Sequence, residues 1–145
     1  MAMTVDALAK HIIGVVRQRN VPVTNLQLQK VLFFTLKQAL NQQLLNEPAI
    51  EKTYDQPFEV WRYGPVEREI YEKYKVYGAD PITERDTENS EYQVLNSVIF
   101  QFLQRDPFEL IHISHQEKFW SQHETYLIGW RSQIAYTLDD VAVED

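Results

Sequence analysis

The sequence contains no cysteine, and this absence excludes several kinds of chemistry at once. Disulfide bonds, thiolate nucleophiles and cysteine-based zinc or iron–sulfur sites all need this residue. A chain without cysteine suits a reducing compartment, and we expect a cytoplasmic protein.

Long apolar runs and low-complexity tracts are missing as well. No run approaches the roughly 20 apolar residues that a membrane span needs, and the N-terminus has no basic stretch followed by a long apolar one, so we expect neither a membrane partner nor a signal peptide. Glycine (4) and proline (6) are scarce, whereas 44% of the residues are hydrophobic and 12% aromatic. Such a composition argues against a disordered or fibrous chain and predicts one globular domain spanning residues 1–145.

Positive charge is in short supply. There are 14 basic and 21 acidic residues, which gives a formal net charge of -7. Direct binding to a phosphate backbone is therefore disfavoured, and Lys10, Arg17 and Arg19 form the only candidate basic stripe. A cationic protein partner is easier to accommodate.

The sequence also lacks the usual signatures of catalysis and metal binding. It contains no Gly-rich phosphate loop, no nucleophile elbow and no His-Glu-x-x-His zinc motif. His112, His115 and His123, with Glu117 nearby, do not have an established metal-ligand spacing, so we expect no metal and no cofactor. We expect His115 instead to hydrogen-bond at a helix junction, with Glu117 as its partner.

What the sequence does contain is helical periodicity, and the fold class that we predict is mainly α. We expect one domain of five to six helices, with a short strand or hairpin before the helix that starts at Gly-Pro. Residues 41–56 and 79–90 are polar and are expected to be connections. The segments with apolar residues at helical spacing are 4–20, 24–40, 65–78, 92–103, 106–116 and 119–134.

Several helix starts are indicated by local capping chemistry. Thr24 with Gln27, and Ser114 with Glu117, have the spacing of a capping box, in which each side chain satisfies the other's free backbone N–H. Asp106 is followed by a proline and then by an acidic residue in the first turn, which is typical of a helix N-terminus.

Residues 57–63 alternate as a short strand does and run into Gly64 and Pro65. Proline is tolerated at the first helical position, and acidic residues at 67 and 69 would be favoured in the first turn by the helix dipole. This pattern predicts a helix that begins at Pro65.

Three separated segments occur together in a fixed order. They are residues 23–34 (VTNLQLQKVLFF), 61–71 (WRYGPVEREIY) and 113–120 (ISHQEKFW). Together they resemble the Panacea domain, the family of SocA-like antitoxins that includes phage-associated GepA-like proteins. The resemblance extends over about residues 5–140, and the chain departs from the family pattern at Phe119, where members usually have proline.

The resemblance implies a bacterial or prophage protein without a cofactor. It further implies an antitoxin that neutralises a co-encoded protein toxin by direct contact, and a cellular protease as a second partner if this chain delivers its toxin for degradation, as one member does. A non-enzymatic binding protein is thus our primary hypothesis.

The candidate partner-binding residues come from the same three segments. Leu28 is expected in the core, whereas Gln29 and Lys30 are expected to be solvated or tied to a neighbouring loop. The Trp-Arg-Tyr cluster at 61–63 is either a packing anchor or an exposed docking patch, because the same residue types serve both purposes. The full candidate set is Gln29, Lys30, Trp61, Arg62, Tyr63, Gly64, Pro65, His115, Glu117 and Trp120.

The sequence leaves two other functions open. The first is a regulatory protein of a prophage or mobile element that contacts nucleic acid. The second is a hydrolase using His115 and Glu117, although Ser114 beside His115 is not a triad, since neighbouring side chains point in different directions. Exposed aromatic residues could equally form a homo-oligomer face.

Overall fold

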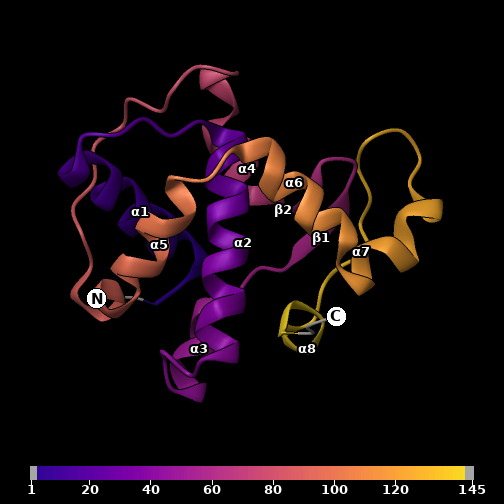
Figure 1. Ribbon diagram of the computed structural model, residues 1–145, viewed down its shortest axis with the longest axis horizontal. Helices are drawn as coiled ribbons and strands as arrows, with labels where there is room; N and C mark the ends of the chain where they lie inside the picture. The colour runs from indigo at the N-terminus through magenta and orange to yellow at the C-terminus, as the bar shows by residue number, and fades with distance from the viewer. Residues whose placement is uncertain (1–2, 143–145) are drawn as a thin grey trace.

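The computed structural model describes residues 3–142 and shows a mainly helical molecule with one two-stranded hairpin beside the central helix (Figure 1). The mainly α class and the short hairpin are confirmed. Short 3₁₀ turns lie at Lys75–Tyr77, Ser90–Leu95 and Glu124–Tyr126, so the helix expected from residue 92 opens as a 3₁₀ turn. The helices and strands are α1 (Val5–Arg19), α2 (Asn25–Asn41), α3 (Glu47–Thr53), β1 (Phe58–Trp61), β2 (Gly64–Glu67), α4 (Arg68–Tyr74), α5 (Asn96–Leu103), α6 (Pro107–Gln116), α7 (Lys118–His123) and α8 (Leu138–Ala142).

Helix α2 is the central element, and it contacts α1, α4, α5, α6, α8 and β2. Figure 1 shows it running through the middle of the molecule. Leu28, Leu32 and Phe33 are fully buried, and the Phe33 ring lies edge-on to the ring of Phe58 at a centroid distance of 5.3 Å. Because each buried side chain of this size contributes about 1.5–3 kcal/mol, α2 accounts for a large part of the core.

The helix starts expected at Thr24 and Asp106 are confirmed, and Thr4 caps α1 in the same way. The side-chain oxygens of Thr4, Thr24 and Asp106 each accept a hydrogen bond from a backbone N–H in the first turn, at 3.0–3.2 Å. The reciprocal contact predicted for the first capping box, between the Gln27 side chain and the backbone N–H of Thr24, is wrong. The Gln27 amide donates instead to the carbonyl of Leu103 at 3.2 Å. It thus ties α2 to the end of α5.

Two segments differ from the predicted secondary structure. Residues 41–56 are not an irregular connection but contain α3, whose N-terminus is capped by Asn46 and whose residue Ile50 is buried. Residues 119–134 are not one helix, since α7 ends at His123 and the chain turns at Gly129, which has φ +74°.

The predicted Ser114–Glu117 capping box is also wrong. The Ser114 hydroxyl is buried and donates to the carbonyl of Ile111 within α6 at 2.7 Å. It is therefore engaged one turn back and does not cap α7, which starts without a side-chain cap.

The helix predicted to begin at Pro65 begins three residues later. Pro65 lies in β2 opposite Val60, and Gly64 lies opposite Trp61, so residues 62 and 63 form a two-residue turn. The buried carboxylate of Glu67 then caps α4. The backbone stays extended because β2 is paired with β1 on one side and, as described below, is held by side chains of α2 on the other.

The other edge of β1 is covered by residues 132–136. The N–H of Val60 donates to the carbonyl of Ile134 at 2.9 Å, and that of Tyr136 donates to the carbonyl of Phe58 at 2.8 Å. The hairpin consequently has no open edge along β1 for a further strand.

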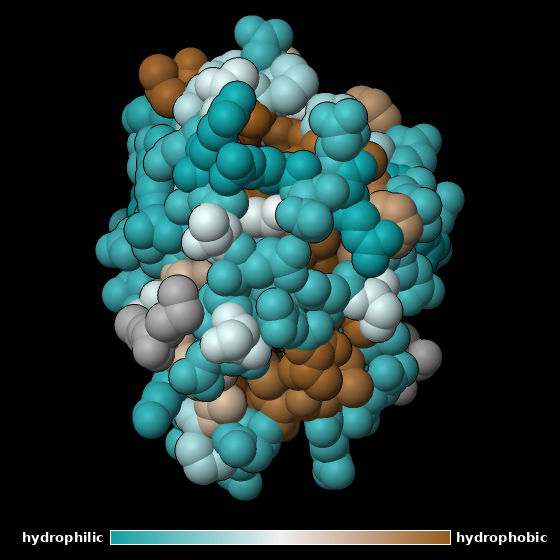
Figure 2. All heavy atoms as spheres, turned by 90° about the vertical axis from the view of Figure 1, so that its left-hand side faces the viewer, coloured by the Kyte–Doolittle hydropathy of each residue, from teal (hydrophilic) through white to brown (hydrophobic). Residues whose placement is uncertain are grey.

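The face formed by α1 and α5 is mainly hydrophilic, with hydrophobic atoms visible in separate patches (Figure 2). On α1, Lys10 pairs with Asp6 at 3.4 Å, and the Arg19 guanidinium lies over the ring of Phe100 at 4.3 Å. Two members of the candidate basic stripe are thus engaged by neighbours. Within residues 3–142, no helix is long and apolar enough to cross a membrane.

Candidate functional site

The β1–β2 hairpin is the place where the sequence-predicted site residues meet. Five of them, residues 61–65, form its turn and the adjoining ends of the strands. Gln29 and Lys30 approach from α2, and His115 and Trp120 approach from α6 and α7. Glu117 is the exception, because its carboxylate pairs with the Lys37 ammonium at 3.1 Å.

Gln29 holds the far end of β2. Its side-chain amide donates to the carbonyl of Glu67 at 3.2 Å, and its amide oxygen accepts from the N–H of the same residue at 2.8 Å. The side chain therefore does for β2 what a neighbouring strand would do. Of the two environments predicted for Gln29, solvent or a neighbouring segment, solvent is wrong, since the residue is fully buried and tied to β2.

Lys30 is likewise fully buried rather than solvated, and its ammonium donates to the carbonyl of Pro65 at 2.9 Å. Proline leaves this part of β2 with a carbonyl but no N–H, so a donor side chain suits it. Burial lowers the pKa of Lys30 from 10.5 to about 7, because a charged amine is disfavoured away from water.

Gly64 allows side chains of α2 and α6 to approach the backbone of β2 closely. A Cβ at residue 64 would collide with the Ser114 hydroxyl and would lie 2.9 Å from the Lys30 nitrogen. The residue also has φ +104°, a backbone conformation that side-chain-bearing residues rarely adopt. Glycine is thus required here by space and by backbone geometry.

The helices α6 and α7 support the hairpin from another side. The indole N–H of Trp120 donates to the carbonyl of Trp61 at 2.8 Å. The His115 ring stacks on the Trp120 ring at a centroid distance of 3.9 Å and hydrogen-bonds the backbone of Arg62. Burial keeps the pKa of His115 below its usual value.

The predicted His115–Glu117 hydrogen bond is wrong. The Nε2 atom of His115 is buried and has no hydrogen-bond partner among the described residues, and Glu117 is directed to Lys37. The side chains of His115 and Glu117, two positions apart, diverge because α6 ends between them, at Gln116.

Trp61 is a packing anchor, which decides between the two roles open to it. Only 1% of it is exposed, and its ring lies edge-on to Tyr71 and Trp130 at 5.1 and 5.3 Å. The Arg131 guanidinium lies 4.6 Å from the centroid of the Trp61 ring, a cation–π contact. Its indole N–H is used as well, since it donates to the Glu59 carboxylate at 3.0 Å.

Arg62 and Tyr63 face solvent at the turn. The Tyr63 side chain is 55% exposed, and the Arg62 guanidinium donates to the carbonyl of Gly129, with a shortest distance of 2.6 Å. Trp130, 43% exposed, lies beside them, and its carbonyl accepts from the N–H of Arg62 at 2.7 Å. We call Arg62, Tyr63 and Trp130 the tip patch.

Trp130 was missed as a site residue because residues 119–134 read as one helix. Gly129 is the signal that could have found it, since a glycine in a helical pattern indicates a turn. Tyr63 and Trp130 also border a shallow groove of about 610 Å³, whose walls include Leu26 and Tyr71.

The arrangement is therefore a small exposed aromatic–arginine surface on a supported turn. We call Gln29, Lys30, His115 and Trp120 the hairpin support.

Within residues 3–142, no three His, Asp or Glu side chains are grouped so that they could hold a metal ion.

Comparison with known proteins identifies a family. A family model described as antitoxin SocA-like, Panacea domain, matches residues 28–121. That range contains all ten residues predicted as partner contacts. No curated protein matches the chain, and no solved structure does.

Proposed function

The chain belongs to the SocA-like antitoxin family with the Panacea domain, and on this premise we propose that it neutralises a co-encoded protein toxin by binding it directly. The toxin contact in this proposal is the tip patch. The hairpin support has no direct contact with the toxin and acts by keeping the turn in place.

The observation that carries the proposal is the division of the family-matching residues into two groups. Gln29, Lys30 and Trp61 are buried and use their polar atoms on the chain itself. Arg62 and Tyr63, in the same matched region, are exposed. Tyrosine, tryptophan and arginine are the residue types enriched where binding energy concentrates.

The mechanism that we propose is occlusion, in which the antitoxin covers the active or target-binding site of the toxin. A turn held by four side chains loses little conformational entropy on binding, so it can present its exposed side chains at low cost. The net charge of -7 would raise the association rate with a basic toxin at low salt. Delivery of the toxin to a protease would use the same complex, with the protease as an additional partner.

We further propose that the protein has no catalytic role of its own. An acid–histidine hydrolase would need the carboxylate to orient the imidazole. Here the Glu117 carboxylate lies against Lys37, and the ring of His115 stacks on Trp120.

The test is co-production with the product of the neighbouring open reading frame in a bacterial host. The proposal expects the neighbour to arrest growth alone, growth to recover when both are made, and the two proteins to co-purify. A neighbour that is harmless alone, together with no co-purification, would refute the antitoxin assignment.

A further inference from the structure

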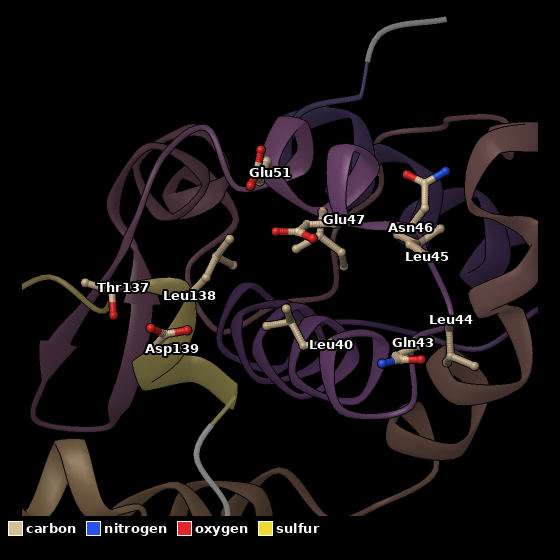
Figure 3. A pocket seen from close by; sticks show the side chains of 11 residues that line it. Leu40, Gln43, Leu44, Leu45, Asn46, Glu47, Glu51, Thr137, Leu138 and Asp139 are labelled. Atoms are coloured by element: carbon tan, nitrogen blue, oxygen red, sulfur yellow. The ribbon is translucent and has the colours of Figure 1, made fainter.

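A second surface lies at the opposite end of α2 from the hairpin support, where α2, α3 and α8 meet. These elements enclose an open groove of about 750 Å³, within the size range of ligand and peptide sites. Its apolar lining residues are Leu40, Leu44, Leu45, Ile50 and Leu138. Figure 3 shows Leu40 and Leu138 reaching into the space between the three helices.

The rim of this groove is acidic. Glu47 and Glu51 stand on α3, and Asp139 stands on α8 (Figure 3). All three are exposed, and none forms an ion pair with any residue between 3 and 142. Among the described residues, no lysine, arginine or histidine lines the groove, so none of its lining side chains neutralises the negative charge.

We propose that this groove, the acidic groove, binds a basic amphipathic helix of a protein partner. Apolar side chains at positions i, i+3, i+4 and i+7 of such a helix would fill the leucine-lined floor. Lysine or arginine residues flanking that stripe would meet Glu47, Glu51 and Asp139. An acidic segment or a nucleic acid would be repelled by the same three carboxylates.

The inference does not depend on the partner being a toxin. The acidic groove shares no residue with the tip patch, so the two surfaces can be tested separately. A negative result for one surface does not contradict the proposal for the other.

The direct test uses a fluorescently labelled synthetic peptide of leucine and lysine, with leucines at helical spacing along one face. Fluorescence anisotropy at physiological salt should show saturable binding to the wild-type protein. A second peptide of the same composition, with its leucines scattered around the helix, should bind at least about tenfold more weakly, because it offers no continuous apolar face. Equal binding of the two peptides would overturn the proposal.

Charge reversal tests the rim against net charge alone. The double variant Glu47→Lys, Glu51→Lys should weaken binding of the amphipathic peptide by at least about tenfold. The matched control is Asp80→Lys, Glu84→Lys, which changes the net charge by the same amount at two exposed positions away from the groove and should retain most of the binding. Equal weakening in both would show attraction to the whole acidic molecule and would overturn the site.

The apolar floor is tested by Leu138→Ser, with thermal unfolding as a check that the variant is folded. Leu138 is half-buried, and we expect the variant to lose peptide binding while α2 and its core stay intact. Self-association of the wild-type chain in sedimentation experiments, abolished by this substitution, would instead assign the groove to a second copy and overturn the proposal.

Discussion

Lys30, on α2 against β2, and Glu67, the last residue of β2, are buried titratable side chains, and burial moves their pKa values in opposite directions. The pKa of Lys30 falls from 10.5 to about 7. Burial raises the pKa of Glu67 from 4.5 to about 7, although the backbone N–H groups that it caps oppose the rise. Both shifts make the free energy of unfolding depend on pH, because folding changes the number of bound protons.

The sign of each effect follows from which state holds the proton. Between pH 7 and 10.5 the unfolded chain keeps the Lys30 proton and the folded chain does not, so the free energy of unfolding rises with pH in that window. Between pH 4.5 and 7 the folded chain keeps the Glu67 proton and the unfolded chain has released it, so the free energy of unfolding falls as pH rises. The two contributions together are least favourable near pH 7.

We therefore predict that Lys30→Met flattens the pH dependence of stability above pH 7, and that Glu67→Gln flattens it below pH 7. Each slope is limited to about 1.4 kcal/mol per pH unit for one proton. Denaturant unfolding of the wild type and both variants from pH 4 to 10 measures this. Slopes in the variants identical to those of the wild type would contradict the burial of these groups.

Gly64 gives a second prediction at the scale of one residue. We expect Gly64→Ala to lower the free energy of unfolding by about 2 kcal/mol or more, because both φ and the space around Lys30 and Ser114 oppose a Cβ. The matched control is Gly78→Ala, which also has positive φ but nothing within 4 Å, and should cost less than Gly64→Ala because only the backbone conformation opposes its Cβ. Equal costs in thermal unfolding would mean that the approach of α6 and α2 to residue 64 is not tight.

At the scale of the element, the predictable features are those set by nearby residues. The helix starts at Thr24 and Asp106 could be read from the sequence because a capping side chain and the N–H that it accepts from are two or three positions apart. The same chemistry at Asn46 would have indicated α3. The hairpin was also predictable, from the alternation before Gly64.

The features that the sequence could not indicate depend on contacts between distant residues. Pro65 followed by acidic residues fits a helix start locally, but Gln29 and Lys30 hold it extended from more than 30 positions away. For the same reason a Leu-Gln-Lys stretch on an amphipathic helix gives no sign that its polar residues are buried. Nine of the ten residues that the sequence proposes as contacts lie together around the hairpin, but their division into buried and exposed groups could not be predicted.

The junction of α2 with β2 provides a prediction at this scale. Gln29→Ala removes both partners of the Glu67 backbone, and leaving buried N–H and C=O groups unpaired should cost about 2–4 kcal/mol. The control Gln38→Ala, on the same helix but half-buried, should change stability by less than about 0.5 kcal/mol. If the two variants unfold at the same denaturant concentration, the amide of Gln29 does not hold β2.

At the scale of the whole molecule, one central helix separates two surfaces of different chemistry. The tip patch offers aromatic rings and a guanidinium on a supported turn, and the acidic groove offers a leucine-lined floor with three carboxylates. A partner could engage either surface, and the proposals assign the toxin to the tip patch. The hairpin support keeps the turn that carries the tip patch in place. Variants of these four residues should therefore change both the stability of the fold and toxin binding.

The measurement that tests the central claim most directly is growth rescue by the double variant Arg62→Ala, Tyr63→Ala, made together with the toxic neighbour, with thermal unfolding of the purified variant beside it. The account predicts that growth is not restored and that stability stays within about 1 kcal/mol of the wild type, because both side chains face solvent. Full rescue by a stable variant would contradict the tip patch as the toxin contact. Loss of rescue together with a large loss of stability would show that these residues hold the fold and would contradict the claim in the other way.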